Sequence, residues 1–494
     1  MKKQSFFYGA SILALASILC KILSAVLKIP LDRFFLHEDG IAVYQSAYSI
    51  YNVFLAICVT GIPIALSSLI AKSDKEEAAS LCRSTLVFVT FFASVCAVML
   101  AAFSGPLAKL LSGGGEGAAQ MSLIILSLSL PVMGVISSRR GYFQGMGNMT
   151  PSAISQLTES LIKVFLGITI CALTVKNGIA HGAAGAISGV SLGCMGSALV
   201  LEMFYRKNAA IKGHFSMEKA LNVIKISIPM TLGAFGFTAV LLTDTLTVPK
   251  ILAMCNVEYT QRLSMFGYLT RANTVYNLPA TIITAFTASA VPAISAAAKL
   301  KDKCKQDETS VRAIKLIFLV AVPCMLGMVL FSKEILNLLY GTSEKWELLA
   351  LAGVMAFIMP YIQTTTAMLQ TLGKVWLPIW VTMAAVVIKA VLNTILVKSI
   401  GVEGALISTL SVFCVVFVIN TIILARSVNL SGSLKNTLKL AVCGAVSCGG
   451  ARLLYSFKEN IIMLVLCVGF AAIVYVGGVL LTGCIKKEEF FAKE

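Results

Sequence analysis

The stretch SQLTESLIKVFLG (residues 155–167) places Glu159 and Lys163 one helical turn apart inside a long apolar segment, residues 151–175. A segment of this length can cross the ~30 Å hydrocarbon core of a bilayer as a helix. A charge near the bilayer centre costs about 2.5–3.5 kcal/mol, so an ionisable residue in such a helix usually faces a partner or a water-filled cavity. The stretch therefore predicts a membrane-spanning helix with a polar interior beside it.

The composition of the whole chain extends this prediction. Of the 494 residues, 58% are hydrophobic and 13% are charged, and the mean hydropathy is +0.88, values typical of an integral membrane protein. Apolar runs long enough to span a bilayer alternate with short polar segments. We predict an all-α integral membrane protein with fourteen transmembrane helices, at residues 5–29, 42–71, 84–108, 119–141, 151–175, 182–205, 219–250, 263–298, 311–338, 346–371, 377–398, 402–425, 435–456 and 461–485.

The basic residues indicate the orientation of the chain. More than half of the 40 Lys and Arg lie in segments on the side of the N-terminus, such as KSDK (72–75) and KLKDKCK (299–305). Cytoplasmic segments of membrane proteins carry such an excess, so both termini are predicted to be cytoplasmic and the location is the cell membrane. The N-terminal segment resembles a signal sequence. Leu19 stands before Cys20 where a lipoprotein cleavage site needs a small residue, so we expect an uncleaved first helix.

No motif for catalysis or metal binding is apparent. The cysteines are scattered without a C-x-x-C pair, and the three histidines are far apart in the sequence. The glycine-rich SGGGEG (112–117) lies between two apolar segments and predicts a loop, because no strand precedes it. We expect no cofactor, no metal, no nucleic-acid partner and no enzymatic activity. Any transport would draw on an ion gradient, the membrane potential or the gradient of the substrate.

The two halves of the chain resemble each other. PIALSSLIAK (63–72) is similar to PAISAAAK (292–299), and a Tyr-Asn pair precedes each, with Asn52 and Asn277 as candidate polar residues of a cavity. Three residues recur at one constant offset: Gln144, Gly147 and Lys163 as Gln370, Gly373 and Lys389. Because six helices per copy is an even number, both copies share one orientation and meet at a central cavity. We predict lobes at 1–210 (helices 1–6) and 211–430 (helices 7–12), followed by an extra helix pair and tail at 431–494.

Three stretches carry a family resemblance: GIPIALSSLIAK (61–72), YFQGMGNMTPSAISQLTESLIKV (142–164) and TRANTVYNLPATIITAFTASAVPAIS (270–295). They resemble the multidrug/oligosaccharidyl-lipid/polysaccharide flippase superfamily, in the branch of stage V sporulation protein B and MurJ-like proteins. The resemblance implies two six-helix lobes and alternating access, and members that move polyprenyl-diphosphate-linked saccharides to the outer leaflet. It also matches Arg271 to an important arginine of the eighth helix. The second helix departs from the pattern, since YNVFLAICVTGIP (51–63) carries no basic residue, and this leaves lipid II specificity open.

Two interpretations of Glu159 and Lys163 remain open. The acid precedes the base by four residues, which favours a mutually neutralising pair within one helix. The repeat favours the other interpretation, because Lys389 occupies the equivalent position and has Ala385, not an acid, one turn earlier. Two lysines at equivalent positions of two lobes would face the central cavity and suit an anionic ligand such as a diphosphate. We favour the cavity interpretation.

Other charges within the spans add candidates. Lys21 lies too deep in the first helix to reach the headgroups, whereas Lys28 lies nearer the outer end and is expected to extend to the surface. Asp244 and Arg271 lie at similar depths in the seventh and eighth helices, which predicts an ion pair. An arginine can also bind phosphate through two parallel hydrogen bonds. Arg139 and Arg140, at the end of the fourth span, are expected to be positive anchors, with attraction of the headgroup as the open alternative.

These features predict a flippase for lipid II or a related polyprenyl-diphosphate-linked saccharide. Its headgroup would contact Lys21, Lys163, Arg271 and Lys389, and its tail would follow a groove at the last two helices. A drug or cation antiporter of the same superfamily is an alternative, which would need a cavity rich in carboxylates and aromatic residues. A membrane scaffold for wall or spore-coat assembly is another, and it would not need unpaired lysines in its spans. The saccharide, the coupling ion and the oligomeric state stay open.

Overall fold

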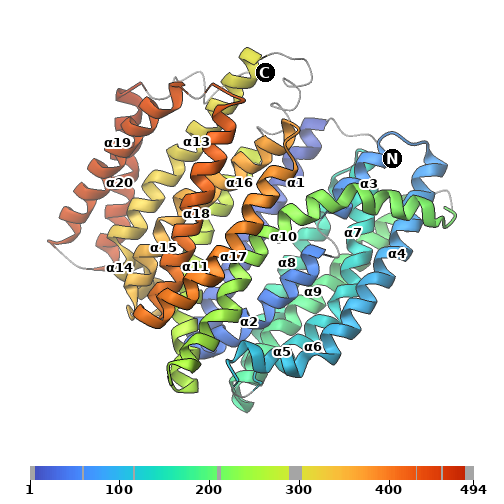
Figure 1. Ribbon diagram of the computed structural model, residues 1–494, viewed down its shortest axis with the longest axis horizontal. Coiled ribbons are helices and arrows are strands. Elements are labelled where there is room, and N and C mark those ends of the chain that lie inside the picture. Colours follow the sequence, from blue (N-terminus) through green and yellow to red (C-terminus); the bar gives the residue numbers. More distant parts are fainter. Residues whose placement is uncertain are drawn as a thin grey trace. The chain divides into compact units, whose positions relative to one another are not determined.

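The computed structural model describes residues 6–57, 61–114, 117–208, 213–288, 303–429, 431–457 and 460–483. These residues form helices and turns without any β-strand, as Figure 1 shows. Eleven of the described helices are long and apolar enough to cross a membrane. The all-α fold of a multi-pass membrane protein is therefore confirmed, whereas the fourteen-helix count and the repeat remain predictions.

Each of the fourteen predicted segments contains helix, but several are divided. The predicted span 42–71 corresponds to α2 (His37–Leu55) and α3 (Ile62–Ile70), with Pro63 in the first turn of α3. The predicted span 84–108 corresponds to α4 (Lys75–Ala102) and α5 (Ser104–Leu111). The repeat motif PAISAAAK (292–299) lies outside the described residues.

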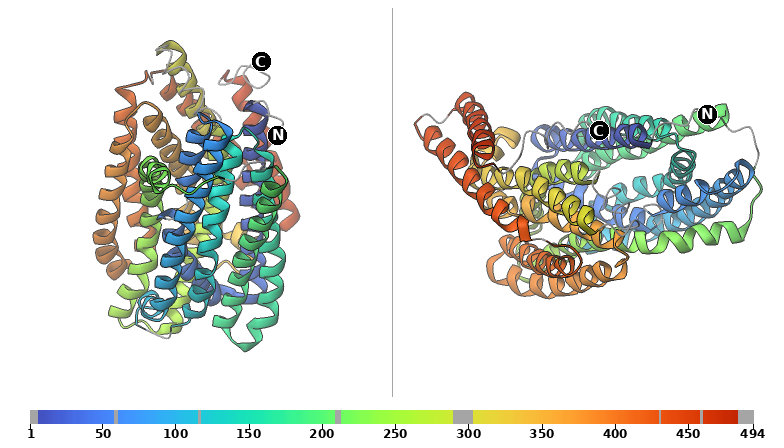
Figure 2. Two further views of the ribbon diagram at one scale, coloured as in Figure 1. Left: turned by 90° about the vertical axis from the view of Figure 1, so that its right-hand side faces the viewer. Right: turned by 90° about the horizontal axis from the view of Figure 1, so that it is seen from above.

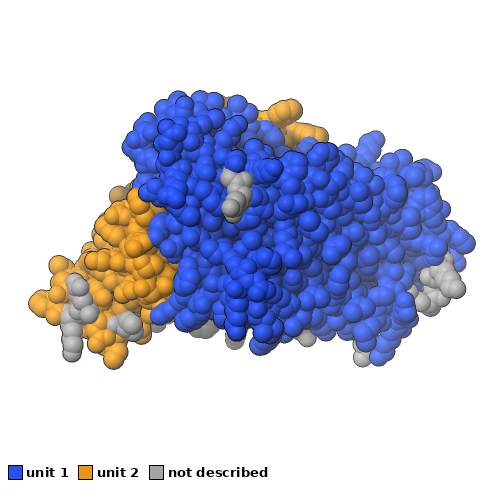
Figure 3. All heavy atoms as spheres, turned by 90° about the horizontal axis from the view of Figure 1, so that it is seen from below, with its two compact units in different colours: residues 1–270, 382–405 blue, residues 271–381, 406–494 orange. Residues whose placement is uncertain are grey.

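The chain divides into two compact units (Figure 3). The first comprises residues 1–270 and 382–405, and the second comprises residues 271–381 and 406–494. Both α11 (Tyr259–Ala288) and α17 (Trp376–Ile400) contribute residues to each unit, as does α18 (Val402–Ala425). The predicted lobe boundaries at residues 210 and 430 stay predictions.

The first unit contains the helices on which most candidate site residues lie. Several of its helices, including α4, α8 and α9, lie roughly parallel to one another in Figures 1 and 2. Its further elements are α1 (Phe6–Pro30), the π-helical turn Leu31–Leu36, α6 (Gln120–Ser127), α7 (Ser129–Gly145), α8 (Thr150–Thr174), the 3₁₀ turn Val175–Asn177, α9 (Ile179–Asn208) and α10 (Met217–Met254).

The second unit has a core rich in aromatic side chains. Phe318 stacks on Phe357 and on Tyr361, with ring centroids 5.0 and 5.6 Å apart, and Tyr361 lies 4.3 Å from Phe417. Such stacked pairs fix the helices that carry them more tightly than their buried area alone would. The further helices of this unit are α13 (Lys303–Leu330), α14 (Ser332–Tyr340), α15 (Trp346–Gly353), α16 (Met355–Thr371), α19 (Ser431–Tyr455) and α20 (Ile461–Leu481).

Glycines bring α8 and α9 into close contact. A Cβ atom added at Gly189 would lie 2.5 Å from the Cα of Gly167, and one added at Gly193 would lie 2.6 Å from the carbonyl oxygen of Glu159. Membrane helices lack a hydrophobic driving force for association, so small residues that allow close backbone approach are the usual means of packing. This contact fixes the stretch of α8 that carries Glu159 and Lys163 against α9.

Candidate functional site

Glu159 forms an ion pair with Arg140 rather than with Lys163. The NH2 atom of Arg140 lies 2.8 Å from Oε2 of Glu159, and the same guanidinium donates to the hydroxyls of Ser155 (3.0 Å) and Ser197 (3.1 Å). Among the residues that the structure describes, no ion pair of 4.0 Å or less joins Glu159 to Lys163. The acid is therefore held by a residue of the neighbouring helix α7, and the pairing within one helix does not form.

Lys163 has a neutral partner. Its Nζ donates to the hydroxyl oxygen of Ser24 on α1 at 2.6 Å, and this hydroxyl donates to the carbonyl oxygen of Cys20 at 2.9 Å. Lys28 also has a neutral partner, because its Nζ donates to Oε1 of Gln45 on α2 at 2.9 Å. Ser24 and Lys28 are four residues apart on α1, so both hydrogen bonds involve the same face of this helix.

We call Lys28, Lys163, Ser24 and Gln45 the lysine cluster. In the described part of the chain, no carboxylate lies within 4.0 Å of either ammonium group. The cluster therefore holds two positive charges solvated by a hydroxyl and an amide, and an anion would compensate them. Lys28 is half-buried and bonded to the next helix, and the expectation that it extends to the headgroups stays a prediction.

Lys21 lies beside this cluster on the same helix. It precedes Ser24 by three residues and Lys28 by seven, a spacing that places all three on one face of α1. Its side chain is exposed, unlike the half-buried Lys28. The predicted residues Lys21 and Lys163 are thus brought to one side of the first unit, together with Lys28, for which the sequence predicted no ligand role.

Lys389 has an acid partner, so the expectation that it is unpaired is wrong. Its Nζ lies 2.7 Å from Oδ2 of Asp244 on α10 and donates to the carbonyl oxygen of Val240 at 2.7 Å, while the whole side chain is buried. Asn393 donates to Oδ1 of Asp244 at 3.0 Å and to Thr247 at 2.8 Å. This network lies within the first unit and is internally neutral.

The close approach of two helices allows this pair to form. A Cβ atom at Gly236 on α10 would lie 2.8 Å from Cγ2 of Thr382 on α17. About two turns further along these helices come Asp244 and Lys389, whose side chains then meet. No direct signal in the sequence indicates this pairing, because the partner lies on another helix and not one turn away on the same one.

The remaining predicted residues have separate surroundings. Arg271 belongs to the second unit, where it is buried and its guanidinium carbon lies 5.3 Å from the ring centroid of Tyr340. The predicted pair between Asp244 and Arg271 stays a prediction. Asn277 donates to the carbonyl oxygen of Asn273 within α11 at 2.7 Å, and Asn52 is half-buried on α2.

Arg139 is a buried residue of α7. Its Nε and NH2 atoms lie 3.1 and 3.0 Å from Oε2 of Glu202 on α9, and its guanidinium carbon lies 3.4 Å from the ring centroid of Tyr205. Arg140 is likewise held inside the unit by Glu159. Both arginines therefore join α7 to its neighbours, and their expected place at the cytoplasmic end of the span stays a prediction. The described residues contain no group of three or more His, Cys, Asp or Glu side chains that could hold a metal ion.

Known proteins with similar sequences cover almost the whole chain. Stage V sporulation protein B of Bacillus subtilis (strain 168) is 24% identical over 99% of this chain and 98% of its own length. Lipid II flippase MurJ of the same organism is 24% identical over 81% of this chain and 79% of its own length. A probable low-salt glycan biosynthesis flippase of Haloferax volcanii, Agl15, is 28% identical over 35% of this chain.

Solved structures show the fold. Lipid II flippase MurJ in an inward closed conformation matches with a TM-score of 0.76 at 15% identity, over 97% of this chain and 99% of that chain. An inward-facing multidrug transporter of the MATE family matches with a TM-score of 0.67 at 16% identity, over 84% of this chain and 98% of that chain. Both similarities extend over most of the helices described above.

The sequence profile of the polysaccharide biosynthesis protein family matches residues 6–298, more than half of the chain. The match includes the lysine cluster and the helices α1 to α10. With the helical fold shared with MurJ and MATE structures, it shows that the chain belongs to the polysaccharide biosynthesis protein family, within the multidrug/oligosaccharidyl-lipid/polysaccharide flippase superfamily.

Proposed function

We propose that the protein is a flippase that moves a polyprenyl-diphosphate-linked saccharide from the inner to the outer leaflet by alternating access. The family assignment supports a transporter of lipid-linked precursors, since relatives whose names state an activity are flippases or transporters and not enzymes. The observation that carries the proposal is the lysine cluster, in which Lys28 and Lys163 have only neutral partners in the described residues.

The lysine cluster fits a diphosphate for an electrostatic reason. A diphosphate offers several anionic oxygens, and hydrogen bonds to charged groups contribute about 1.5–3 kcal/mol each. Ser24 and Gln45 are neutral acceptors that can release the ammonium groups to the anion without stranding a buried charge. Lys21, exposed on the same face of α1, would extend the positive surface along the path of the headgroup.

Arg140 has a supporting part in this mechanism. Glu159 lies one turn from Lys163 and would neutralise it if the two side chains met. Because Arg140 binds Glu159 at 2.8 Å, the carboxylate is directed away and Lys163 keeps its charge for the ligand. Arg271 stays a proposed phosphate contact that rests on the family resemblance, and the groove at α19 and α20 stays a proposed path for the tail.

Lys389 has a different proposed role from the one predicted. An ammonium group that is already neutralised by Asp244 and fully buried offers little to an incoming anion. We propose that the pair holds α10 against α17 during the conformational change. The proposed substrate is a cell-wall or polysaccharide precursor, with lipid II as the first candidate. In the proposed orientation both termini face the cytoplasm.

The antiporter alternative has a specific weakness. A drug or cation antiporter needs an acidic group that is available to a cation, yet Glu159 and Asp244 are each bound by a basic side chain. The scaffold alternative does not account for Lys28 and Lys163, which have no carboxylate partner among the described residues although such charges are costly in membrane helices.

The function is tested by measuring which leaflet holds the precursor. Cells depleted of the protein should retain lipid-linked saccharide in the inner leaflet, as measured by protection of the saccharide from an external modifying enzyme. Re-expression of the wild type should restore external access, and expression of Lys28→Gln/Lys163→Gln should not. External access that is unchanged by depletion, in cells lacking other flippases of this family, would exclude the proposed function.

A further inference from the structure

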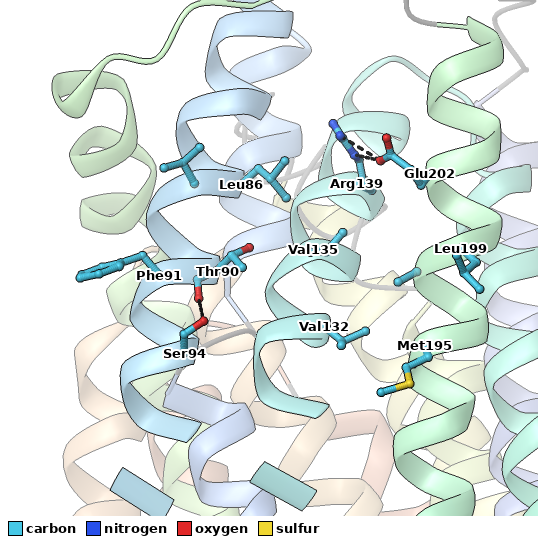
Figure 4. Close-up of a pocket in the computed structure, with 12 residues that line it drawn as sticks. Leu86, Thr90, Phe91, Ser94, Val132, Val135, Arg139, Met195, Leu199 and Glu202 are labelled. Atoms are coloured by element: carbon cyan, nitrogen blue, oxygen red, sulfur yellow. Dashed lines mark hydrogen bonds and ion pairs between the residues drawn. The ribbon is translucent and has the colours of Figure 1, made fainter. Parts of the chain in front are cut away.

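A groove of about 830 Å³ runs between α4, α7 and α9 of the first unit (Figure 4). Its volume lies in the range of about 300–1,000 Å³ that is typical of ligand sites. The groove opens to the outside, because Phe91 and Leu199 on its two rims are 69% and 66% exposed. Its lining is mostly apolar and comprises Leu86, Val87, Thr90, Phe91, Ser94, Val132, Val135, Arg139, Met195, Ala198, Leu199 and Glu202.

One end of the groove is polar. Figure 4 shows Arg139 and Glu202 pointing toward each other there, above Val135 and Leu199. Glu202 also accepts a hydrogen bond from Nε of Arg206, one turn further along α9, at 3.2 Å. The guanidinium of Arg139 is buried, whereas that of Arg206 is 80% exposed. The groove therefore passes from an apolar channel to an ion pair and then to an exposed arginine.

Basic residues outnumber acidic ones at this end. Arg83 is exposed on α4, one turn before the lining residues Leu86 and Val87, and Lys207 is exposed beside Arg206 on α9. Since Arg139 compensates Glu202, the charges of Arg83, Arg206 and Lys207 remain. Arg139 lies six residues before the end of α7, a depth of about 9 Å at 1.5 Å per residue. The positive end thus lies within two helical turns of the end of α7.

The groove is distinct from the lysine cluster. Arg139 and Arg140 are adjacent in α7 but point to different sides, since Arg139 binds Glu202 at the groove and Arg140 binds Glu159 and Ser155 of α8. Helix α7 therefore separates the two features. A substrate whose headgroup binds Lys163 does not require this groove for its tail.

We infer that this groove binds an anionic glycerophospholipid of the surrounding bilayer. One acyl chain lies along Val132, Val135 and Leu199, and the phosphate contacts Arg83 and Arg206. The apolar lining matches the acyl chain, and the basic end favours an anionic over a zwitterionic headgroup. The bound lipid bridges α4 and α9 across α7 and stabilises this side of the first unit. The inference does not depend on the proposed transport activity.

The test uses the full chain purified in detergent. Retained lipid is measured by mass spectrometry, and the unfolding temperature is measured with added phosphatidylglycerol or phosphatidylcholine. Leu199→Trp fills the groove from its exposed rim without crowding the core. Val98→Trp is the matched control, because Val98 lies on α4, is 69% exposed and does not line the groove. Arg83→Gln/Arg206→Gln tests the charged end.

The inference expects the wild type and Val98→Trp to retain phosphatidylglycerol and to be stabilised by it more than by phosphatidylcholine. Leu199→Trp should bind it at least tenfold more weakly, on the order expected for a lost acyl-chain contact. Arg83→Gln/Arg206→Gln should lose the preference between the two lipids. Equal retention by Leu199→Trp and Val98→Trp would overturn the inference. Equal effects of both lipids on the wild type would also overturn it. So would a Leu199→Trp variant that loses only retained polyprenyl phosphate, because that result would assign the groove to the substrate tail.

Discussion

The partner of each ammonium group decides what a lysine in a membrane helix can do in this protein. Lys28 and Lys163 donate to an amide and a hydroxyl, so their charges remain available to an anion. Lys389 is bound by the carboxylate of Asp244, so its charge is compensated before any ligand arrives. The sequence shows that these three lysines lie in apolar helices but not which of them has an acid on a neighbouring helix.

Removal of Lys389 should lower the stability of the folded protein rather than weaken the binding of the substrate. Lys389→Ala leaves Asp244 buried without its cation, and breaking a buried pair costs about 3–5 kcal/mol. We expect low membrane abundance and a lowered unfolding temperature for Lys389→Ala, and recovery of both in Asp244→Asn/Lys389→Met. Abundance of Lys389→Ala at the wild-type level would show that the pair has no structural role.

Removal of Arg140 tests whether Glu159 is held away from Lys163. In Arg140→Gln the carboxylate is free to turn toward Lys163 and to compensate its charge. Precursor flipping should fall about tenfold, the change that accompanies a loss of about 1.4 kcal/mol of binding. Arg140→Gln/Glu159→Gln should recover activity at equal abundance. A double variant that is no more active than Arg140→Gln would indicate a direct contact of Arg140 with the substrate.

At the scale of the helices, the apolar runs predicted the positions of the elements well. Each predicted span contains helix, because length and hydropathy determine which segments can enter a membrane. The breaks between α2 and α3 and between α4 and α5 were missed, since an apolar run continues across both of them. The contacts between helices were also missed, because they depend on small residues whose neighbours are distant in the sequence.

The contact between α8 and α9 gives a prediction at this scale. Gly189→Ala places a Cβ 2.5 Å from the backbone of Gly167 and should force the helices apart at a cost of about 1–3 kcal/mol. We expect a lower unfolding temperature and weaker flipping, since Lys163 moves with α8. Gly477→Ala on α20 is the control, because no described atom lies within 4 Å of a Cβ at that position. Equal stabilities of the two variants would contradict this account of the packing.

For the whole molecule, the fold and the family could be predicted from the sequence, because both depend on the order of apolar segments and on extended motifs. The site could be predicted only in part. Lys163 was identified from its place in an apolar helix. Lys28 was expected at the headgroups because it lies near the end of its helix, and its bond to Gln45 of another helix could not be read from the sequence. The bond of Asp244 to Lys389 could not be predicted, because it depends on the packing of α10 on α17. The pair of Asp244 with Arg271 stays a prediction.

The orientation of the whole chain is testable with reporter fusions. The excess of Lys and Arg predicts that fusions after Lys75 and Lys303 report the cytoplasm, and that fusions after Lys176 and Lys345 report the outside. Enzymatic reporters that are active on only one side of the membrane provide the measurement. One discordant fusion would correct the fourteen-helix prediction locally, and reversal of all four would invert it.

The claim that Lys28 and Lys163 hold the anionic headgroup is tested most directly by flipping of a fluorescent polyprenyl-diphosphate saccharide in proteoliposomes. The wild type is compared with Lys28→Gln/Lys163→Gln and with Lys176→Gln, whose side chain is exposed outside the helical spans. We expect the double variant to insert and unfold like the wild type but to flip the lipid at least tenfold more slowly, because two charge-assisted contacts are lost. Lys176→Gln should flip normally. A double variant that flips the lipid at the wild-type rate would contradict the account.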